Sequence, residues 1–158
     1  MNKYEAAGIS MVRISNRLLT NQTLIRLLKD TSREVLQNGN TYKIEQVLGT
    51  NIILEPFVDD SKDQESKVVV RLPQFNRLDD NTNYLLNLIA FDVYCPKGTW
   101  GIDANAQRPY LIMKEIDQMF EGYKLNGIGT VTSQGAELVV PYDELAGFSM
   151  VYGSIEQN

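Results

Sequence analysis

Apolar side chains are most concentrated between residues 83 and 124. The run 84–95 is the most apolar in the chain, and both alternating sets of its side chains are apolar. This pattern is typical of a central β-strand whose two faces are both covered. A helix can cover one face, and the other is left to the N-terminal helices or to a neighbouring subunit. Asp92 interrupts the run, and a buried acid needs a partner, for which Arg71 and Arg108 are the candidates.

A polar, glycine-bearing loop follows the strand, and then a second apolar pattern begins. Beyond Pro109, which suits the first turn of a helix, apolar residues recur at steps of three and four. They are Ile112, Met113, Ile116, Met119, Phe120 and Tyr123. We predict an amphipathic helix that packs on the strand and ends at Asn126 and Gly127.

The region before the central strand predicts helices first and strands afterwards. Residues 9–38 have the spacing of two helices, with a cap at Thr20 and Asn21 and a stop at Gly39. Residues 42–47 alternate like a strand, and residues 51–57 form a short strand after a turn at Gly49. The β-branched run 68–72 predicts a strand that pairs antiparallel with 85–94. Pro73 is expected to end it, which leaves 73–83 as a loop.

The C-terminal region predicts more strands. Residues 128–133 and 136–141 flank Gln134 and Gly135, a hairpin signal, and 145–155 alternates as a last strand. Along the chain we thus expect helices, then strands, then one helix, then strands, with no βαβ alternation. This order predicts an α+β fold. Its sheet is mainly antiparallel, with N-terminal helices and one amphipathic helix packed on it. A length of 158 residues predicts a single domain over 1–158.

Two loops stand out in this domain. Residues 58–67 are acidic and polar, and we predict a flexible loop there; Gln64 and Val70 occupy positions where a calcium-binding EF-hand loop needs glycine and glutamate. Residues 95–108 predict a displayed loop that carries Trp100, the only tryptophan. This side chain either folds under the loop as a plug or anchors a partner.

The composition argues against several classes of function. A formal net charge of −5 disfavours proteins that grip nucleic-acid phosphates. With no histidine and one cysteine, the common hydrolytic triads and zinc sites are absent, and the single Cys95 fits a reducing cytoplasm. No apolar run reaches the roughly 18 residues of a transmembrane helix. We therefore expect a binding protein with no catalytic, cofactor-binding or metal-binding residues, and no membrane partner.

The order of features resembles the tail-terminator and tail-completion (neck) proteins of long-tailed bacteriophages. The resemblance covers residues 9–155 and rests on patterns: N-terminal helices with residues 21–28, a central strand ending at 91–94, and a turn bearing Arg108. One amphipathic helix, a hairpin and an aromatic-rich last strand follow. The loop 95–108 and the acidic loop have no counterpart that we can match to that family.

The resemblance implies a structural protein of the virion tail or neck, present in the host cytoplasm during assembly. Such proteins form rings, usually hexamers, that stop growth of the tail tube and join it to the head connector, while DNA passes through without being held. Contacts with other subunits or neck partners are then expected at Trp100, Lys97, Asp103 and Arg108, and in the acidic loop at Asp59 and Asp60. Two alternatives stay open: a head-completion adaptor, and a small metal-dependent nuclease or phosphodiesterase that uses loop acids with Asp92 and Asp103.

Overall fold

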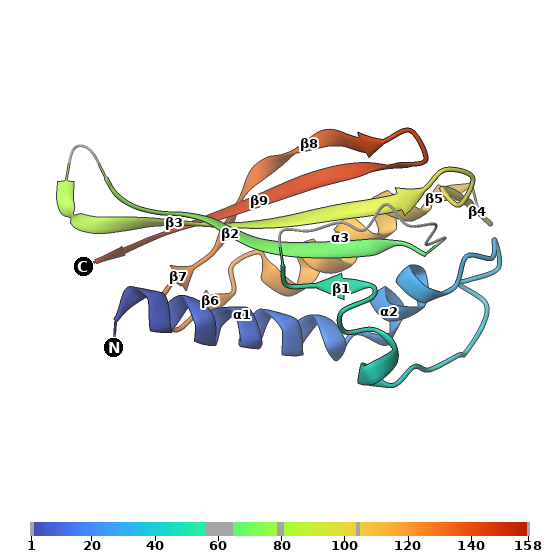
Figure 1. Ribbon diagram of the computed structural model, residues 1–158, viewed down its shortest axis with the longest axis horizontal. Helices are drawn as coiled ribbons and strands as arrows, with labels where there is room; N and C mark the ends of the chain where they lie inside the picture. Colours follow the sequence, from blue (N-terminus) through green and yellow to red (C-terminus); the bar gives the residue numbers. More distant parts are fainter. Residues whose placement is uncertain (1, 56–64, 79–80, 104, 158) are drawn as a thin grey trace.

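A five-stranded sheet in the order β1-β2-β3-β9-β8 forms the centre of the molecule, and three helices pack against one of its faces (Figure 1). The computed structural model describes residues 2–55, 65–78, 81–103 and 105–157. All sheet neighbours are antiparallel except β1 and β2. The predicted α+β class, with N-terminal helices and one helix on a mainly antiparallel sheet, is confirmed.

The predicted central strand is β3, Asn81–Pro96, which lies between β2, Lys67–Leu78, and β9, Leu145–Gln157. Its pairing with β2 is antiparallel, as predicted, with Val68 opposite Val93. Ile89 and Phe91 enter the main core beside Ile116 of α3, Arg108–Phe120. This strand and this helix were predictable because each carries a long, regular apolar repeat.

Both faces of β3 are buried in its central part, but their coverings differ. The N-terminal helices share the main core with α3, so they cover the same face and not the opposite one. The opposite face holds a smaller cluster of Val69, Tyr94 and Leu145. Of the two coverings considered for that face, the N-terminal helices were therefore wrong, and a neighbouring subunit stays a prediction.

The N-terminal helices differ from the prediction at their outer ends. The first, α1, runs over Lys3–Leu19, begun by an Asn2–Glu5 capping box. The second, α2, is Gln22–Lys29, and the predicted cap at Asn21 is confirmed by its side chain accepting from the Leu24 N–H. Helix α2 ends at Lys29 and not near Asn38, because its last carbonyls are capped by a residue distant in the sequence, described below.

Several predictions between α2 and β3 were wrong in detail. Residues 44–46 form a short 3-10 helix, Ile44–Gln46, and β1 contains only Ile52–Ile53. Strand β2 begins at Lys67, and this residue is buried, so the predicted loop 58–67 ends before Lys67. The predicted contact residues Asp59 and Asp60 lie outside the described residues. Strand β2 also continues past Pro73 through a break in register. Pro73 is tolerated because it falls in this break, between Arg71 and Gln74, where β2 has no partner on β3, and because β1 pairs with β2 only at Val68 and Val69.

The C-terminal strands show the largest departure from prediction. Helix α3 ends at Phe120, before the predicted Asn126 and Gly127, which instead connect β6, Lys124–Leu125, to β7, Gly129–Thr130. The predicted hairpin at Gln134 and Gly135 is absent. Strand β8, Thr132–Tyr142, runs through these residues with a bulge, where Gly135 has φ +120°. The predicted last strand is confirmed as β9.

Candidate functional site

The predicted contact loop, residues 95–108, is a folded structure and not a freely displayed loop. Strand β4, Gly101–Ile102, pairs with β5, Ala106–Gln107, and Ile102 is buried in the main core. Asn105 has φ +58°, a conformation that asparagine tolerates. The small sheet holds Trp100 and Arg108 against the body of the protein.

Trp100 is half-buried and bound to its own chain. Its indole N–H donates to the Cys95 carbonyl over 3.1 Å, and its ring centroid lies 6.4 Å from that of Phe148. Trp100 also lines an open cavity of about 360 Å³ with Lys97, Asp143, Leu145 and others. These contacts support the plug interpretation; a partner contact at Trp100 stays a prediction.

Arg108 is the residue that ties this loop to the helices. It is 1% exposed, and its guanidinium donates to the carbonyls of four residues. These acceptors are Leu27 at 2.7 Å, Asp30 at 2.6 Å, Ser32 at 2.9 Å and Thr99 at 2.8 Å. Leu27 lies in the last turn of α2 and Asp30 is the residue after its end, so Arg108 supplies a cap for this helix. Burial lowers the pKa of Arg108, and the donors named are directed into the chain, which gives Arg108 a structural role within the subunit.

The other predicted contact residues lie near the surface. Lys97 is exposed and its backbone N–H donates to the Glu144 carbonyl. Asp103 forms a 3.7 Å ion pair with Arg33, and both side chains are well exposed. The structure brings Lys97 and Trp100 to one cavity, whereas Asp103 lies with Arg33.

Asp92 has the partner that burial requires, and of the two candidates it is Arg71. Arg71 donates twice to the Asp92 carboxylate, at 2.5 and 3.0 Å, and the Ser149 hydroxyl donates over 2.6 Å. The bond to Asp92 raises the pKa of Arg71. Because these donors already occupy the carboxylate, Asp92 is poorly placed to bind a metal ion.

Neither a metal-binding cluster nor an exposed cysteine is present among the described residues. No group of three acidic or cysteine side chains among them is placed to hold a metal ion. The Cys95 thiol is buried, and burial raises its pKa to about 11, which keeps it protonated and unreactive near neutral pH. Every buried side-chain nitrogen or oxygen in the described part of the chain has a hydrogen-bond partner. Nor does any helix in this part have the length and apolarity to cross a membrane.

The surface with the clearest capacity for binding is one that sequence reasoning missed. Within the described residues β8 pairs only with β9, so its outer edge has no strand beside it. Leu138 and Val140 of this strand are 63% and 60% exposed. Leu138 lies opposite Phe148 of β9, whose ring is 5.2 Å from that of Tyr110, an exposed residue in the first turn of α3. We call these four residues, Tyr110, Leu138, Val140 and Phe148, the β8 patch.

A signal for this edge was present in the sequence. Pro141 follows three apolar residues, and proline within a strand favours an edge position. The dipeptide Gln134-Gly135 drew the prediction towards a hairpin, although a glycine at positive φ also suits a bulge.

The fold defines an α+β protein, and among its described residues the outer edge of β8 carries exposed apolar side chains. A family model described as YomW matches residues 21–153, from the cap of α2 into β9, and the chain belongs to this YomW family. Comparison with curated proteins finds no match.

Proposed function

We propose that this chain is a structural virion protein of a long-tailed phage. It forms a ring at the head-proximal end of the tail, terminates growth of the tail tube and joins the tail to the head. The observation that carries the proposal is the outer edge of β8, which no strand of the described residues covers and which exposes Leu138 and Val140. An exposed apolar edge strand is a hazard for a monomer, because unpaired backbone groups and apolar side chains promote association. Its presence favours a protein that works by assembly.

The resemblance supplies the place of assembly. The resemblance to tail-terminator proteins rests on an order of elements: N-terminal helices, central antiparallel strands, one amphipathic helix and an aromatic last strand. The α+β class that this order predicts is the class of fold observed. In this proposal the partners are further copies of the chain, the tail tube and the head connector, and no cofactor takes part.

A closed ring requires each subunit to use two different surfaces, one for each neighbour. The β8 patch provides one such surface. The net charge of −5 suits a channel for DNA, because a bore without a positive excess does not hold the passing phosphates. The protein would assemble in the host cytoplasm and remain in the virion.

The test combines oligomeric mass with infection. The purified protein should form a closed ring of about six 17.9 kDa chains, seen by light scattering and negative-stain microscopy. Infection without the protein should yield separate heads and tails, with tails of irregular length. A monomeric protein, or one absent from virions, would contradict the proposal. Co-purification with isolated heads, and not with tails, would favour the head-completion position instead.

A further inference from the structure

The chain contains two asparagines that are followed by glycine, in the pairs Asn38-Gly39 and Asn126-Gly127. In such a pair the backbone nitrogen of the glycine can attack the side-chain carbonyl carbon of the asparagine, because glycine has no Cβ to obstruct the approach. A bond forms between these two atoms, the side-chain amide leaves as ammonia with the proton of the attacking nitrogen, and a cyclic succinimide results. Water then opens the ring at either carbonyl and yields aspartate or isoaspartate.

Asn126 and Gly127 form the exposed turn between β6 and β7. The turn is closed by the Ile128 N–H, which donates to the Leu125 carbonyl over 3.1 Å. Among the described residues, no hydrogen bond fixes the Asn126 side chain and none engages the Gly127 N–H. The carbon that is attacked and the nitrogen that attacks it therefore meet without the loss of any such bond.

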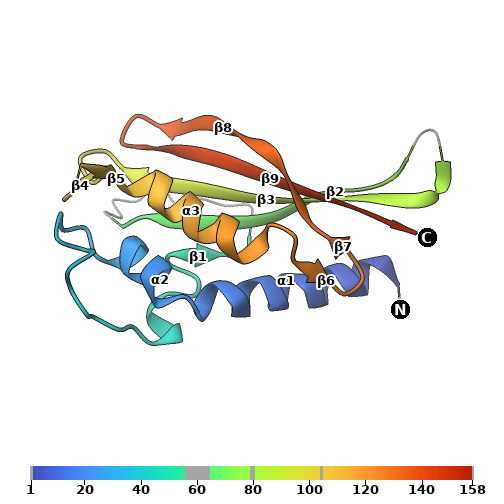
Figure 2. The same ribbon diagram turned by 180° about the vertical axis from the view of Figure 1, so that it is seen from behind.

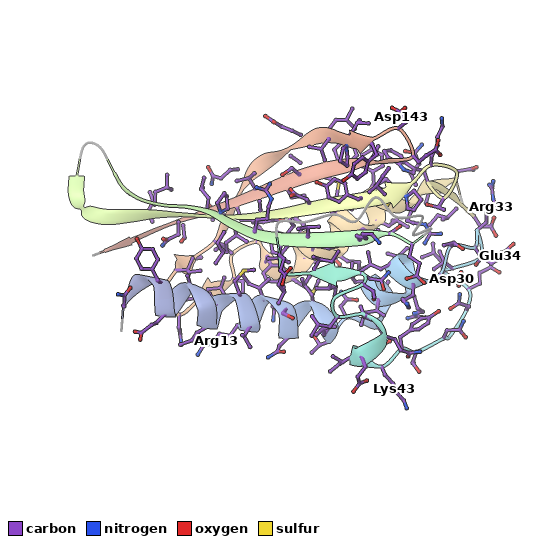
Figure 3. The ribbon with its side chains drawn as sticks, in the orientation of Figure 1. Arg13, Asp30, Arg33, Glu34, Lys43 and Asp143 are labelled. Atoms are coloured by element: carbon purple, nitrogen blue, oxygen red, sulfur yellow. The ribbon has the colours of Figure 1, made fainter. Side chains whose placement is uncertain are left out.

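The side chain of Asn38, in contrast, is held at both of its polar atoms. Its nitrogen donates to the Asp30 carboxylate, and its oxygen accepts from the Asn40 N–H over 3.2 Å. Attack on Asn38 must first break these bonds, and the nearby carboxylate disfavours the negative charge that develops as the attacking nitrogen loses its proton. Figures 1 and 3 show Asp30 and the β6–β7 turn at opposite ends of the molecule, so the two pairs can react independently.

Packing requires glycine at position 127. Gly127 has φ +82°, and a Cβ placed on it would lie 2.7 Å from the Ala6 Cβ of α1. Figures 1 and 2 both show the β6–β7 hairpin beside the N-terminal half of α1, where the Ser10 hydroxyl donates to the Asn126 carbonyl over 3.3 Å. A larger residue at position 127 would slow the attack, but the contact with α1 leaves no room for it. The fold thus requires the residue that makes Asn126 reactive.

We propose that Asn126 is a site of spontaneous modification, at which the asparagine of the folded protein converts to aspartate or isoaspartate, whereas Asn38 stays intact far longer. Water is the only other reactant and ammonia is the only product released, so the reaction needs no enzyme, metal ion or partner chain. The site is therefore independent of the proposed ring, and it gives the protein a chemical change that proceeds with time after folding.

Conversion to isoaspartate weakens the attachment of the β6–β7 hairpin. The main chain of isoaspartate passes through the former side chain, which lengthens the turn by a methylene group and displaces the carbonyls on either side of Gly127. In the unmodified protein the Asn126 carbonyl accepts from Ser10 of α1, and the Ile128 carbonyl accepts from Asn87 of β3 and Ser154 of β9. Loss of these bonds loosens the hairpin from both the helix and the sheet.

Peptide mapping by mass spectrometry, with digestion at mildly acidic pH, measures both sites after storage of the full chain at mildly alkaline pH. In the folded protein Asn126 should convert at least about tenfold faster than Asn38, because attack on Asn38 must break two hydrogen bonds. In urea-unfolded protein both sites should convert at similar rates. Asn126→Gln is the matched variant, since glutamine must close a larger ring; its position 126 should stay unchanged while Asn38 behaves as in the wild type.

Stored wild type should also unfold at a lower urea concentration than fresh wild type, whereas Asn126→Gln should keep its midpoint on storage. The proposal is wrong if Asn38 converts as fast as Asn126 in the folded protein. It is equally wrong if Asn126 converts only after unfolding, because the folded turn would then protect it. A midpoint that falls by the same amount in the wild type and in Asn126→Gln would overturn the structural consequence drawn for the hairpin.

Discussion

At the residue scale, Arg108 decides where α2 ends and how the loop 95–108 is held. The sequence drew attention to it as a contact residue because it is a cation in a loop before a helix. Nothing local shows that its acceptors are the Leu27, Asp30 and Ser32 carbonyls, more than seventy positions earlier. Such a cap joins segments that only the tertiary fold brings together, which is why sequence patterns alone could not reveal it.

Replacing Arg108 with Ala should destabilise the subunit by about 3 kcal/mol or more. The change leaves buried carbonyls without their donor, and each hydrogen bond to a charged group contributes about 1.5–3 kcal/mol. Urea unfolding measures the effect. Arg33→Ala is the matched control, because its ion pair with Asp103 is exposed and should matter by less than about 1 kcal/mol. An equal, small loss in both variants would contradict the structural role of Arg108.

Cys95 makes the stability of the subunit fall at high pH. Burial raises the pKa of its thiol from the ordinary 9.0 to about 11. A raised folded-state pKa means that the stabilisation is complete below pH 9 and is lost as the pH rises towards 11. Two pKa units correspond to about 2.7 kcal/mol. Between pH 8 and 11 the wild type should therefore lose about 2 kcal/mol more than Cys95→Ala in urea unfolding; parallel losses would show that the thiol does not contribute.

At the element scale, the regular apolar repeats were the reliable guide. Strand β3 and helix α3 follow from repeats of two and of three to four, because each buries a whole face over many residues. Strand β8 followed only in part: its residues 136–141 were predicted as a strand, but its passage through Gln134 and Gly135 was not, because its described side chains are mostly exposed and show little pattern. Sequence patterns missed the candidate site for the same reason, because an exposed edge strand does not have the alternation of a strand that is buried within its own subunit.

The pairing of β3 with α3 can be tested through two buried residues. Phe91 stacks on Phe120, with ring centroids 4.8 Å apart, and lies in the same core cluster as Ile116. Phe91→Ala and Ile116→Ala should each cost about 2–5 kcal/mol of unfolding free energy, because each leaves a cavity in the core. The exposed Val12→Ala should change the stability of the isolated subunit by less than about 0.5 kcal/mol. Losses below about 1 kcal/mol at both core positions would contradict this packing.

At the scale of the whole molecule, surface and charge point towards assembly. The β8 patch is exposed to solvent, while the buried side-chain nitrogen and oxygen atoms of the described residues all have hydrogen-bond partners. The alternative of a metal-dependent nuclease needs carboxylates that converge on an ion. Asp92 is bound by Arg71 and Ser149, and Asp103 lies with Arg33, so these two acids do not share a site.

The assembled ring should neither hold nor cleave DNA. Non-specific DNA binding depends on basic side chains that release counterions from the phosphates, and typical dissociation constants are about 10⁻⁴–10⁻⁶ M at physiological salt. A chain with a net charge of −5 and a pI near 4.8 repels the duplex, so we expect binding weaker than about 10⁻⁴ M by fluorescence anisotropy on a labelled duplex. Added Mg²⁺ should yield no cleavage above that of a variant lacking both Asp92 and Asp103. Tight binding of DNA that weakens steeply with salt would contradict this expectation and reveal a basic surface in the assembled ring. Metal-dependent cleavage of DNA by the wild type, lost in the double variant, would establish the nuclease in place of the structural ring.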